Sequence, residues 1–331
     1  MWPDKRLTRR CWLAHAGALG LLGASPAGHA QFLKGLFMRN TNPETAAMNW
    51  DISFCRYGID IAPRESGLVT TLTGDNWLKD AEGKTVAVFY TNFGAAWGLG
   101  SSGMSSVSPH ARLPKTLRLT YYDYLDARFY RLDAELPLRR LHELFFEAPK
   151  VVSKRSPNYG QVAPRYDELR IGVAPDGYVM LWVVGNANDT QMELAQYRAQ
   201  VLTGLTPQSY NARRPPGSFE LDEERWLALD RMSPQTRERV KAGWRPDPMW
   251  YMQRIRIKYP WRHALVGNVS RLTELTSHQG DAQSESLGQW EMATYAQVNR
   301  MRAIPKSAFF WFHDLRSEER RVGKECLRLC R

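Results

Sequence analysis

YDELRIGVAPDGYVMLWVV, residues 166–184, is the stretch of this sequence that decides the fold. It predicts a β-hairpin, because a turn sequence joins two segments rich in β-branched and aromatic residues. Pro175 and Asp176 suit the two central positions of a type I turn, and Gly177 supplies the positive φ that returns the chain through a bulge. The turn should therefore fix which residues of the two strands pair.

The hydrophobic pattern sets the register of this hairpin. Closing Ala174 on Tyr178 pairs apolar residues along one whole face and puts Arg170 beside Trp182 on the other face. A slip of one residue would break the apolar face. The second strand is apolar on both faces, which predicts a central strand that is covered on both sides.

The flanking segments predict an α+β fold, with a mostly antiparallel sheet and helices packed on one of its faces around the central hairpin. Pro137 should begin a helix whose apolar face contains Leu138, Leu141, Leu144 and Phe145. Thr190 and Glu193 have the spacing of a capping box, which predicts a helix through Leu202. Strands are expected at 50–61, 85–91, 117–121 and 126–136.

The remaining composition predicts how the chain is divided. At 331 residues with 43% hydrophobic residues, it could form one large or two ordinary domains. Helices are expected at 218–232 and 233–243, and strands at 252–259 and 308–312. The expected parts are a signal peptide (1–30), an α+β domain (31–206), a Pro-rich linker or loop (207–217), C-terminal helices and strands packed on the same domain (218–315), and a foreign tail (316–331).

The first thirty residues have the pattern of an export signal. Basic residues precede an apolar run at 11–24, and small residues end at Ala30, so Met1 to Ala30 is predicted to be a signal peptide. The run is too short to span a membrane. Arg9 and Arg10 also fit a twin-arginine signal, so the general secretory (Sec) route and the twin-arginine route both stay open. We expect a periplasmic protein.

The last residues resemble a translated sequencing adapter, from Arg316 to Cys326. The natural chain is therefore expected to be interrupted at about Leu315, and resequencing of the gene would test this. The tail carries six positive and three negative charges, so the net charge would fall from +11 to +8 without it. Cys55 would then be the one cysteine of the mature chain, and its apolar surroundings predict a buried side chain.

The charge distribution does not predict a nucleic-acid partner, because lysine and arginine are scattered and are densest at the two ends. One candidate binding surface is the strand expected at 252–259, whose outer face is basic. A solvated face and an edge guarded by charge are the alternatives. The candidate partner-binding residues are Arg254, Arg256, Lys258, Trp261 and Arg262.

No catalytic, cofactor or metal site is predicted. Gly98, Gly100 and Gly103 match the spacing of a dinucleotide loop, but the prolines at 109 and 114 prevent the helix that must follow. The histidines lack metal-ligand spacing, and Asp123, Asp126 and Asp133 are expected at turns and on strand faces.

Several segments together resemble the bacterial domain of unknown function (DUF) 2931 family. They are LPKTLRL (113–119), YYD (121–123), LPL (136–138) and, above all, the hairpin with its Pro-Asp-Gly turn, with a fainter similarity at KYPWR (258–262). The resemblance implies an exported envelope protein, often a lipoprotein, and no functional residues to carry over. This chain lacks the lipobox of the lipoprotein members.

These observations predict a non-catalytic binding or protein-interaction module of the cell envelope, with an envelope protein or a secreted effector as its partner. The alternatives are an immunity-type protein that neutralises an envelope-targeted toxin, a hydrolase whose serine lies within 100–108, and a basic protein that adheres to anionic lipid or polysaccharide.

Overall fold

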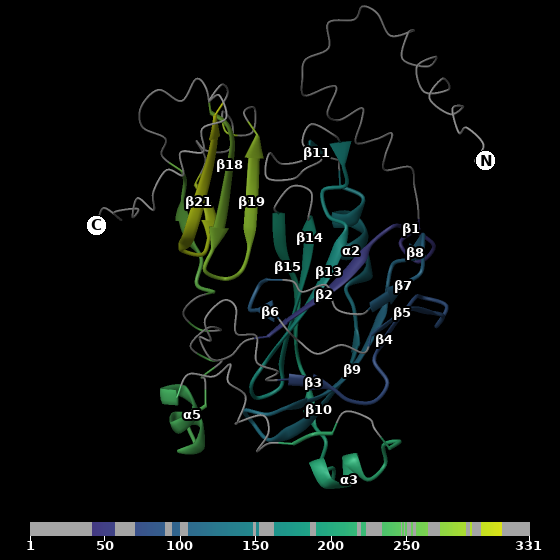
Figure 1. Cartoon of the computed structure of the whole chain (residues 1–331). Helices are drawn as coiled ribbons and strands as arrows, with labels where there is room; N and C mark the ends of the chain where they lie inside the picture. Colours follow the sequence, from purple (N-terminus) through teal and green to yellow (C-terminus); the bar gives the residue numbers. More distant parts are fainter. Residues whose placement is uncertain are drawn as a thin grey trace, which may run out of the picture. The chain divides into compact units, whose positions relative to one another are not determined.

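A computed structural model gives the fold (Figure 1). It describes residues 42–56, 70–89, 95–99, 105–147, 150–151, 162–185, 190–216, 220–222, 234–245, 247, 249, 253, 256–263, 272–288, 292 and 299–312. All described residues belong to one compact unit, Thr41–Arg331. No helix among them is long and apolar enough to cross a membrane.

The predicted hairpin lies inside an eight-stranded sheet. The strand order is β21-β18-β19-β15-β14-β13-β2-β6, and β2 runs parallel to both β13 and β6 while the other pairs are antiparallel. The strands are β2 (Asp51–Arg56), β6 (Ala95–Ala96), β13 (Glu168–Ala174), β14 (Tyr178–Gly185), β15 (Thr190–Arg198), β18 (Leu272–Gln279), β19 (Ser284–Gly288) and β21 (Pro305–Phe312).

A second sheet of seven strands has the order β16-β10-β9-β4-β5-β7, with β3 also paired to β9. Its strands are β3 (Thr70–Leu72), β4 (Trp77–Lys79), β5 (Thr85–Phe89), β7 (Ser105–Val107), β9 (Thr116–Asp123), β10 (Arg128–Glu135) and β16 (Gln200–Val201). Three small antiparallel pairs join β1 (Ala47–Met48) to β8 (Ala111–Arg112), β11 (Lys150–Val151) to β12 (Val162–Ala163), and β17 (Tyr259–Trp261) to β20 (Arg300–Arg302).

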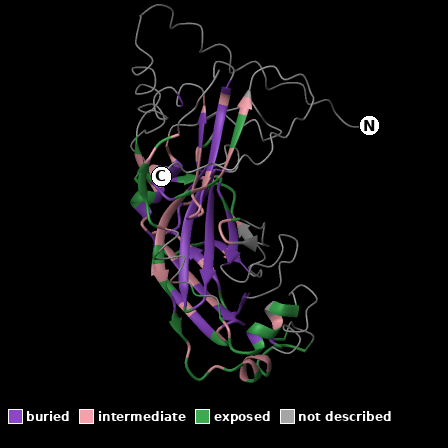
Figure 2. Cartoon of the chain, turned by 90° about the vertical axis from the view of Figure 1, so that its left-hand side faces the viewer, coloured by how far each residue is buried: buried purple, intermediate pink, exposed green. Residues whose placement is uncertain are grey.

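Side chains from both large sheets form one hydrophobic core. Phe54 of β2, Ile171 of β13 and Leu181 of β14 lie in it together with Leu119 and Tyr121 of β9. Buried residues accordingly run along the central strands (Figure 2). Burying these side chains contributes about 1.5–3 kcal/mol each, so this core is the main source of stability.

The predicted hairpin register is confirmed. Ala174 pairs with Tyr178, Arg170 pairs with Trp182, and every residue of β14 is buried. The turn differs from the prediction, because Asp176 has φ 63° as well as Gly177 with φ 76°. A type I turn requires φ of about −90° at its second central residue, so the positive φ of Asp176 excludes it, and aspartate tolerates this conformation.

The fold is mostly β, and its sheets are mostly antiparallel, as predicted, but the few short helices of the described residues do not support an α+β layout with helices packed on one face. Helix α2 (Leu138–Phe145) is confirmed, with its four predicted apolar residues buried in the core. Helix α5 (Pro234–Lys241) is also confirmed and is followed by Gly243 at φ 86°. Helix α3 (Pro207–Asn211) begins the segment predicted as a linker, and the described residues contain no other long helix.

The helix predicted from Thr190 to Leu202 is β15 followed by β16. A β-bulge in the pairing with β14, between Leu181 and Trp182, explains the error. The bulge adds one residue, so the core-facing Met192 and Ala195 are three residues apart, which is also a helical spacing. Pairing along the apolar strand β14 outweighs the local capping signal.

The strand predicted at 252–259 is also not found as such. Among the described residues of this segment, Arg256 to Lys258 precede β17, which begins only at Tyr259. Arg254 lies outside the described residues, as does most of the helix predicted at 218–232. The final predicted strand, 308–312, is confirmed as part of β21.

Candidate functional site

The structure gives Arg256, a predicted partner-binding residue, an internal partner. Its Nε donates to Glu193 Oε2 at 3.2 Å, its Nη2 also binds the Glu193 carboxylate, and its Nη1 donates to Gln196 Oε1 at 2.7 Å. Glu193 and Gln196 lie on β15. Arg256 therefore holds its own segment against the sheet, and its guanidinium nitrogens are all engaged in hydrogen bonds within the protein.

Trp261 also forms hydrogen bonds within the protein, whereas two other candidate partner-binding residues, Lys258 and Arg262, are exposed. Its indole Nε1 donates to the carbonyl oxygens of Arg302 at 3.2 Å and Ala303 at 3.1 Å, which links β17 to β20. The side chains of Lys258 and Arg262 lie on the surface. The structure therefore places these two and the rim of Trp261 where a partner could reach them.

A partly buried charged cluster that the sequence did not reveal joins this region to β19. Arg302 donates to both oxygens of Glu285, at 2.6 and 3.0 Å, and His263 Nε2 lies 3.2 Å from Glu285 Oε1. Burial alone would raise the pKa of Glu285, but the hydrogen bonds from His263 and Arg302 hold it below its usual value. Since the three residues are far apart in the chain, no local motif could have shown this cluster.

Apolar side chains are exposed around this cluster. Of the eight large apolar residues that are exposed in the described part of the chain, six belong to residues 257–310. They are Ile257 (43%), Tyr259 (46%), Met301 (61%), Ile304 (51%), Phe309 (41%) and Phe310 (46%). We call the exposed residues of 257–262 and 301–310 the C-terminal surface.

The C-terminal surface is also basic. The described residues 256–263 and 299–312 contain six lysines and arginines and no aspartate or glutamate. Arg256 and Arg302 are paired with glutamates of the sheet. Lys258 and Lys306 are exposed and form no ion pair within the described residues, so the surface combines apolar contact area with positive charge.

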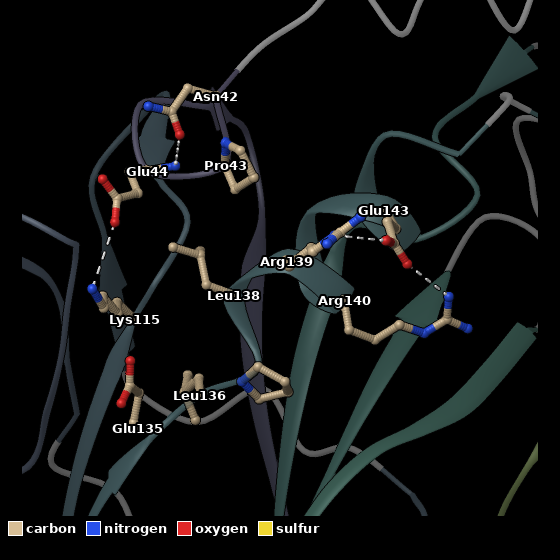
Figure 3. A pocket seen from close by; sticks show the side chains of 11 residues that line it. Asn42, Pro43, Glu44, Lys115, Glu135, Leu136, Leu138, Arg139, Arg140 and Glu143 are labelled. Atoms are coloured by element: carbon tan, nitrogen blue, oxygen red, sulfur yellow. Dashed lines mark hydrogen bonds and ion pairs between the residues drawn. The ribbon is translucent and has the colours of Figure 1, made fainter.

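A groove of about 600 Å³ lies where β9, β10 and α2 meet the segment at 42–44 (Figure 3). Its lining includes Leu136, Pro137 and Leu138, and its rim is charged. The rim charges are satisfied by one another: Lys115 pairs with Glu44 at 3.6 Å, and Glu143 pairs with Arg139 at 3.5 Å and Arg140 at 3.2 Å. Of the charged residues that line the groove, only Glu135 forms no ion pair within the described residues.

The polar face of the hairpin contains a closed network around Arg170. Its guanidinium donates to Ser53 Oγ at 2.9 Å, to Glu168 Oε1 at 2.8 Å, to the carbonyl of Gly98 at 2.9 Å and to Gln191 Oε1. Ser53 also donates to Glu168, and all four side chains are buried. A serine next to a carboxylate could suggest catalysis, but a buried and fully bonded network holds structure.

Cys55 lies on the same face as this network and is buried, as predicted. Burial raises the pKa of its thiol to about 12, with Arg170 opposing this shift. The thiol is therefore protonated and shielded, which fits a packing role. Of the candidate hydrolase serines, Ser101 and Ser102 lie outside the described residues.

A second buried polar cluster lies at the end of the β9–β10 hairpin. Asp123 accepts hydrogen bonds from the backbone N–H groups of Leu125 at 2.7 Å and Asp126 at 3.2 Å. Asp126 in turn accepts from Tyr130 Oη at 2.7 Å and from the N–H of Asp176 at 2.5 Å, which connects the two hairpin turns. Burial, and then the charge of Asp126, raises the pKa of Asp123 to about 7.

This raised pKa predicts that Asp123→Asn removes a pH dependence of stability. The carboxyl has a pKa of about 4 in the unfolded chain, so between about pH 4 and pH 7 the folded protein holds a proton that the unfolded chain lacks. The stability that this proton contributes is complete below about pH 4 and is lost as the pH rises through 7. The free energy of unfolding of Asp123→Asn minus that of the original protein should therefore be larger at about pH 8 than at about pH 5.

Urea unfolding at several pH values measures this difference. The surface variant Asp133→Asn is the control: hydrogen bonds from Arg118 and Arg131 outweigh its partial burial and hold its pKa below the usual value, so its effect should not change over this range. If the change in free energy of unfolding caused by Asp123→Asn were also the same at every pH, the prediction would be contradicted.

The fold and these sites define a mostly β protein with one core between two sheets, buried polar clusters, and an exposed apolar and basic surface. Within the described residues, no group of three or more histidine, cysteine, aspartate or glutamate side chains could hold a metal ion. The family model "Protein of unknown function (DUF2931)" matches residues 38–241, more than half of the chain, so the chain belongs to this family. No curated protein and no solved structure matches the chain.

The extent of the match separates two parts of the structure. The matched residues include both strands of the hairpin, the Arg170 network from Ser53 to Gln191, and helix α2. They end before β17. The C-terminal surface therefore lies outside the part of the chain that the family model covers.

Proposed function

We propose that the protein is exported to the cell envelope and acts there as a non-catalytic protein-interaction module. The observation that carries this proposal is the C-terminal surface, where six large apolar side chains are exposed in a region rich in lysine and arginine. Exposed apolar residues that lie close together in a folded protein mark binding surfaces, and Tyr259 and Met301 lie on the paired strands β17 and β20. Tyrosine, phenylalanine, methionine and arginine are also the residue types that protein interfaces favour.

Export is supported by the signal-peptide pattern of residues 1–30. Cell fractionation of a protein with a carboxyl-terminal tag tests export. The protein should be found in the periplasm, cleaved after Ala30 so that residues 1–30 are removed. Replacing both Arg9 and Arg10 with lysine separates the two routes, because it blocks twin-arginine export and leaves Sec export intact.

Loss of exposed apolar contacts should weaken the interaction. We expect Tyr259→Ser with Met301→Ser to reduce recovery of the partner by about tenfold or more, since central aromatic residues contribute most to binding energy. The measurement is cross-linking in intact cells, followed by purification and quantification of the recovered protein. A secreted effector as the partner would indicate an immunity-type role, and a resident envelope protein would indicate an assembly role.

Leu99→Ser is the matched control, because Leu99 is equally exposed (64%) and lies outside the C-terminal surface. It should leave recovery unchanged. The thermal unfolding temperature of all variants should stay close to that of the original protein, because each replaced side chain is exposed. Equal recovery with the control and with the double variant would show that this surface does not bind the partner.

A further inference from the structure

We infer that β21 receives an acidic, extended segment of a partner protein, which adds to the eight-stranded sheet as a further strand. This inference rests on the proposed function, because it states how part of the C-terminal surface binds. It assigns both the backbone groups and the side chains that take part.

The first support is the position of β21 in the sheet. Among the described residues it is a terminal strand, and seven of its eight residues are paired with residues of β18 (Figure 1). A terminal strand presents backbone N–H and C=O groups to another chain unless charge, proline or irregularity protects it. Pro305, Lys306 and a register shift at Lys306 protect the start of β21, and a second shift lies between Trp311 and Phe312. Residues 307–311, Ser-Ala-Phe-Phe-Trp, contain neither proline nor charge.

The second support is the pair of exposed aromatic residues in this unprotected half. Phe310 is opposite Leu275, and Phe309 is opposite Thr276, so the two rings lie on opposite faces of the sheet. Phe309 also contacts His278 edge to face, at 5.7 Å between ring centres. An added strand would therefore find an aromatic contact on each face, in addition to the backbone ladder.

The third support is charge complementarity. Lys306 is exposed on β21 itself and forms no ion pair within the described residues, whereas the charge of Arg302 on the preceding strand β20 is already balanced by Glu285. With no acidic residue in 299–312, this part of the chain attracts negative charge. Nucleic acid or an anionic membrane would respond to the same charge, but neither can continue the backbone ladder of a strand, so a peptide segment is favoured.

The test uses the full chain and a fluorescent ten-residue peptide of alternating glutamate and valine, with binding followed by fluorescence anisotropy. We expect binding that weakens as salt rises. Affinity should fall by about tenfold or more when alternate backbone nitrogens of the peptide are methylated, because this removes the donors along one edge. A lysine–valine peptide should bind at least about tenfold more weakly than the glutamate–valine peptide.

Lys306→Glu should reverse the preference, so that the lysine–valine peptide binds more tightly than the glutamate–valine peptide. Lys84→Glu is the matched control, because Lys84 is also exposed but lies far from β21 in the sequence; it should leave the preference unchanged. Equal binding of the methylated and unmethylated peptides would overturn strand addition. Binding of RNA or anionic vesicles without binding of the peptide would also overturn it. If the peptide does not bind but Tyr259 and Met301 are needed for partner recovery, the strand mode fails while the proposed function stands.

Discussion

Gly177→Val should destabilise the folded protein by about 2–5 kcal/mol. Gly177 has φ 76°, and a valine in this left-handed conformation costs about 1–2 kcal/mol. A Cβ at this position would also lie 2.6 Å from the carbonyl oxygen of Ala199 and 3.1 Å from the ring of Tyr130. Such overpacking adds about 1–3 kcal/mol, and it would strain the hydrogen bond from Ala199 N to Gly177 O, which is 2.7 Å long.

Gly204→Val separates these two contributions. Gly204 has φ 80°, but a Cβ there would meet no atom within 4 Å, so only the backbone strain of about 1–2 kcal/mol should remain. Urea unfolding followed by circular dichroism measures both variants. If Gly177→Val were no less stable than Gly204→Val, the close packing of the hairpin turn against Ala199 and Tyr130 would be refuted.

Arg170→Met should destabilise the protein by about 3–5 kcal/mol. The substitution keeps much of the side-chain length but leaves the buried carboxylate of Glu168 without its cation. It also removes the donors to Ser53, Gln191 and the Gly98 carbonyl. A buried charge that loses its partner costs far more than a surface ion pair.

Two further variants test the reason for this loss. Replacing Arg170 and Glu168 together with methionine should recover part of the stability, because no unpaired charge is then buried. Arg139→Met should change stability by less than about 1 kcal/mol, since its ion pair with Glu143 is at the surface, where the Arg139 side chain is 90% exposed. If the double variant were less stable than Arg170→Met alone, the network would be stabilising as a unit, against this prediction.

Features with a local cause could be predicted from the sequence. The hairpin at 166–184 follows from alternation and from a Pro-Asp-Gly turn, and α2 follows from a proline before an apolar helical face. The candidate partner-binding residues were found because basic residues cluster near Lys258. The exposure of each candidate could not be predicted in the same way, because it depends on contacts with distant residues: Arg256 binds Glu193, and Trp261 binds the backbone carbonyl of Arg302.

By itself, the sequence determined the central hairpin, its register, helix α2 and the burial of Cys55, because neighbouring residues carry those signals. Only the tertiary structure decided that residues 190–198 form a strand, since pairing with β14 and its bulge outweighs a capping box. It also decided that Arg170 binds Ser53, Glu168 and Gln191, and that β21 ends the sheet of the described residues with Phe309 and Phe310 exposed. Contacts between residues far apart in the chain depend on the complete fold, and no short stretch of sequence encodes them.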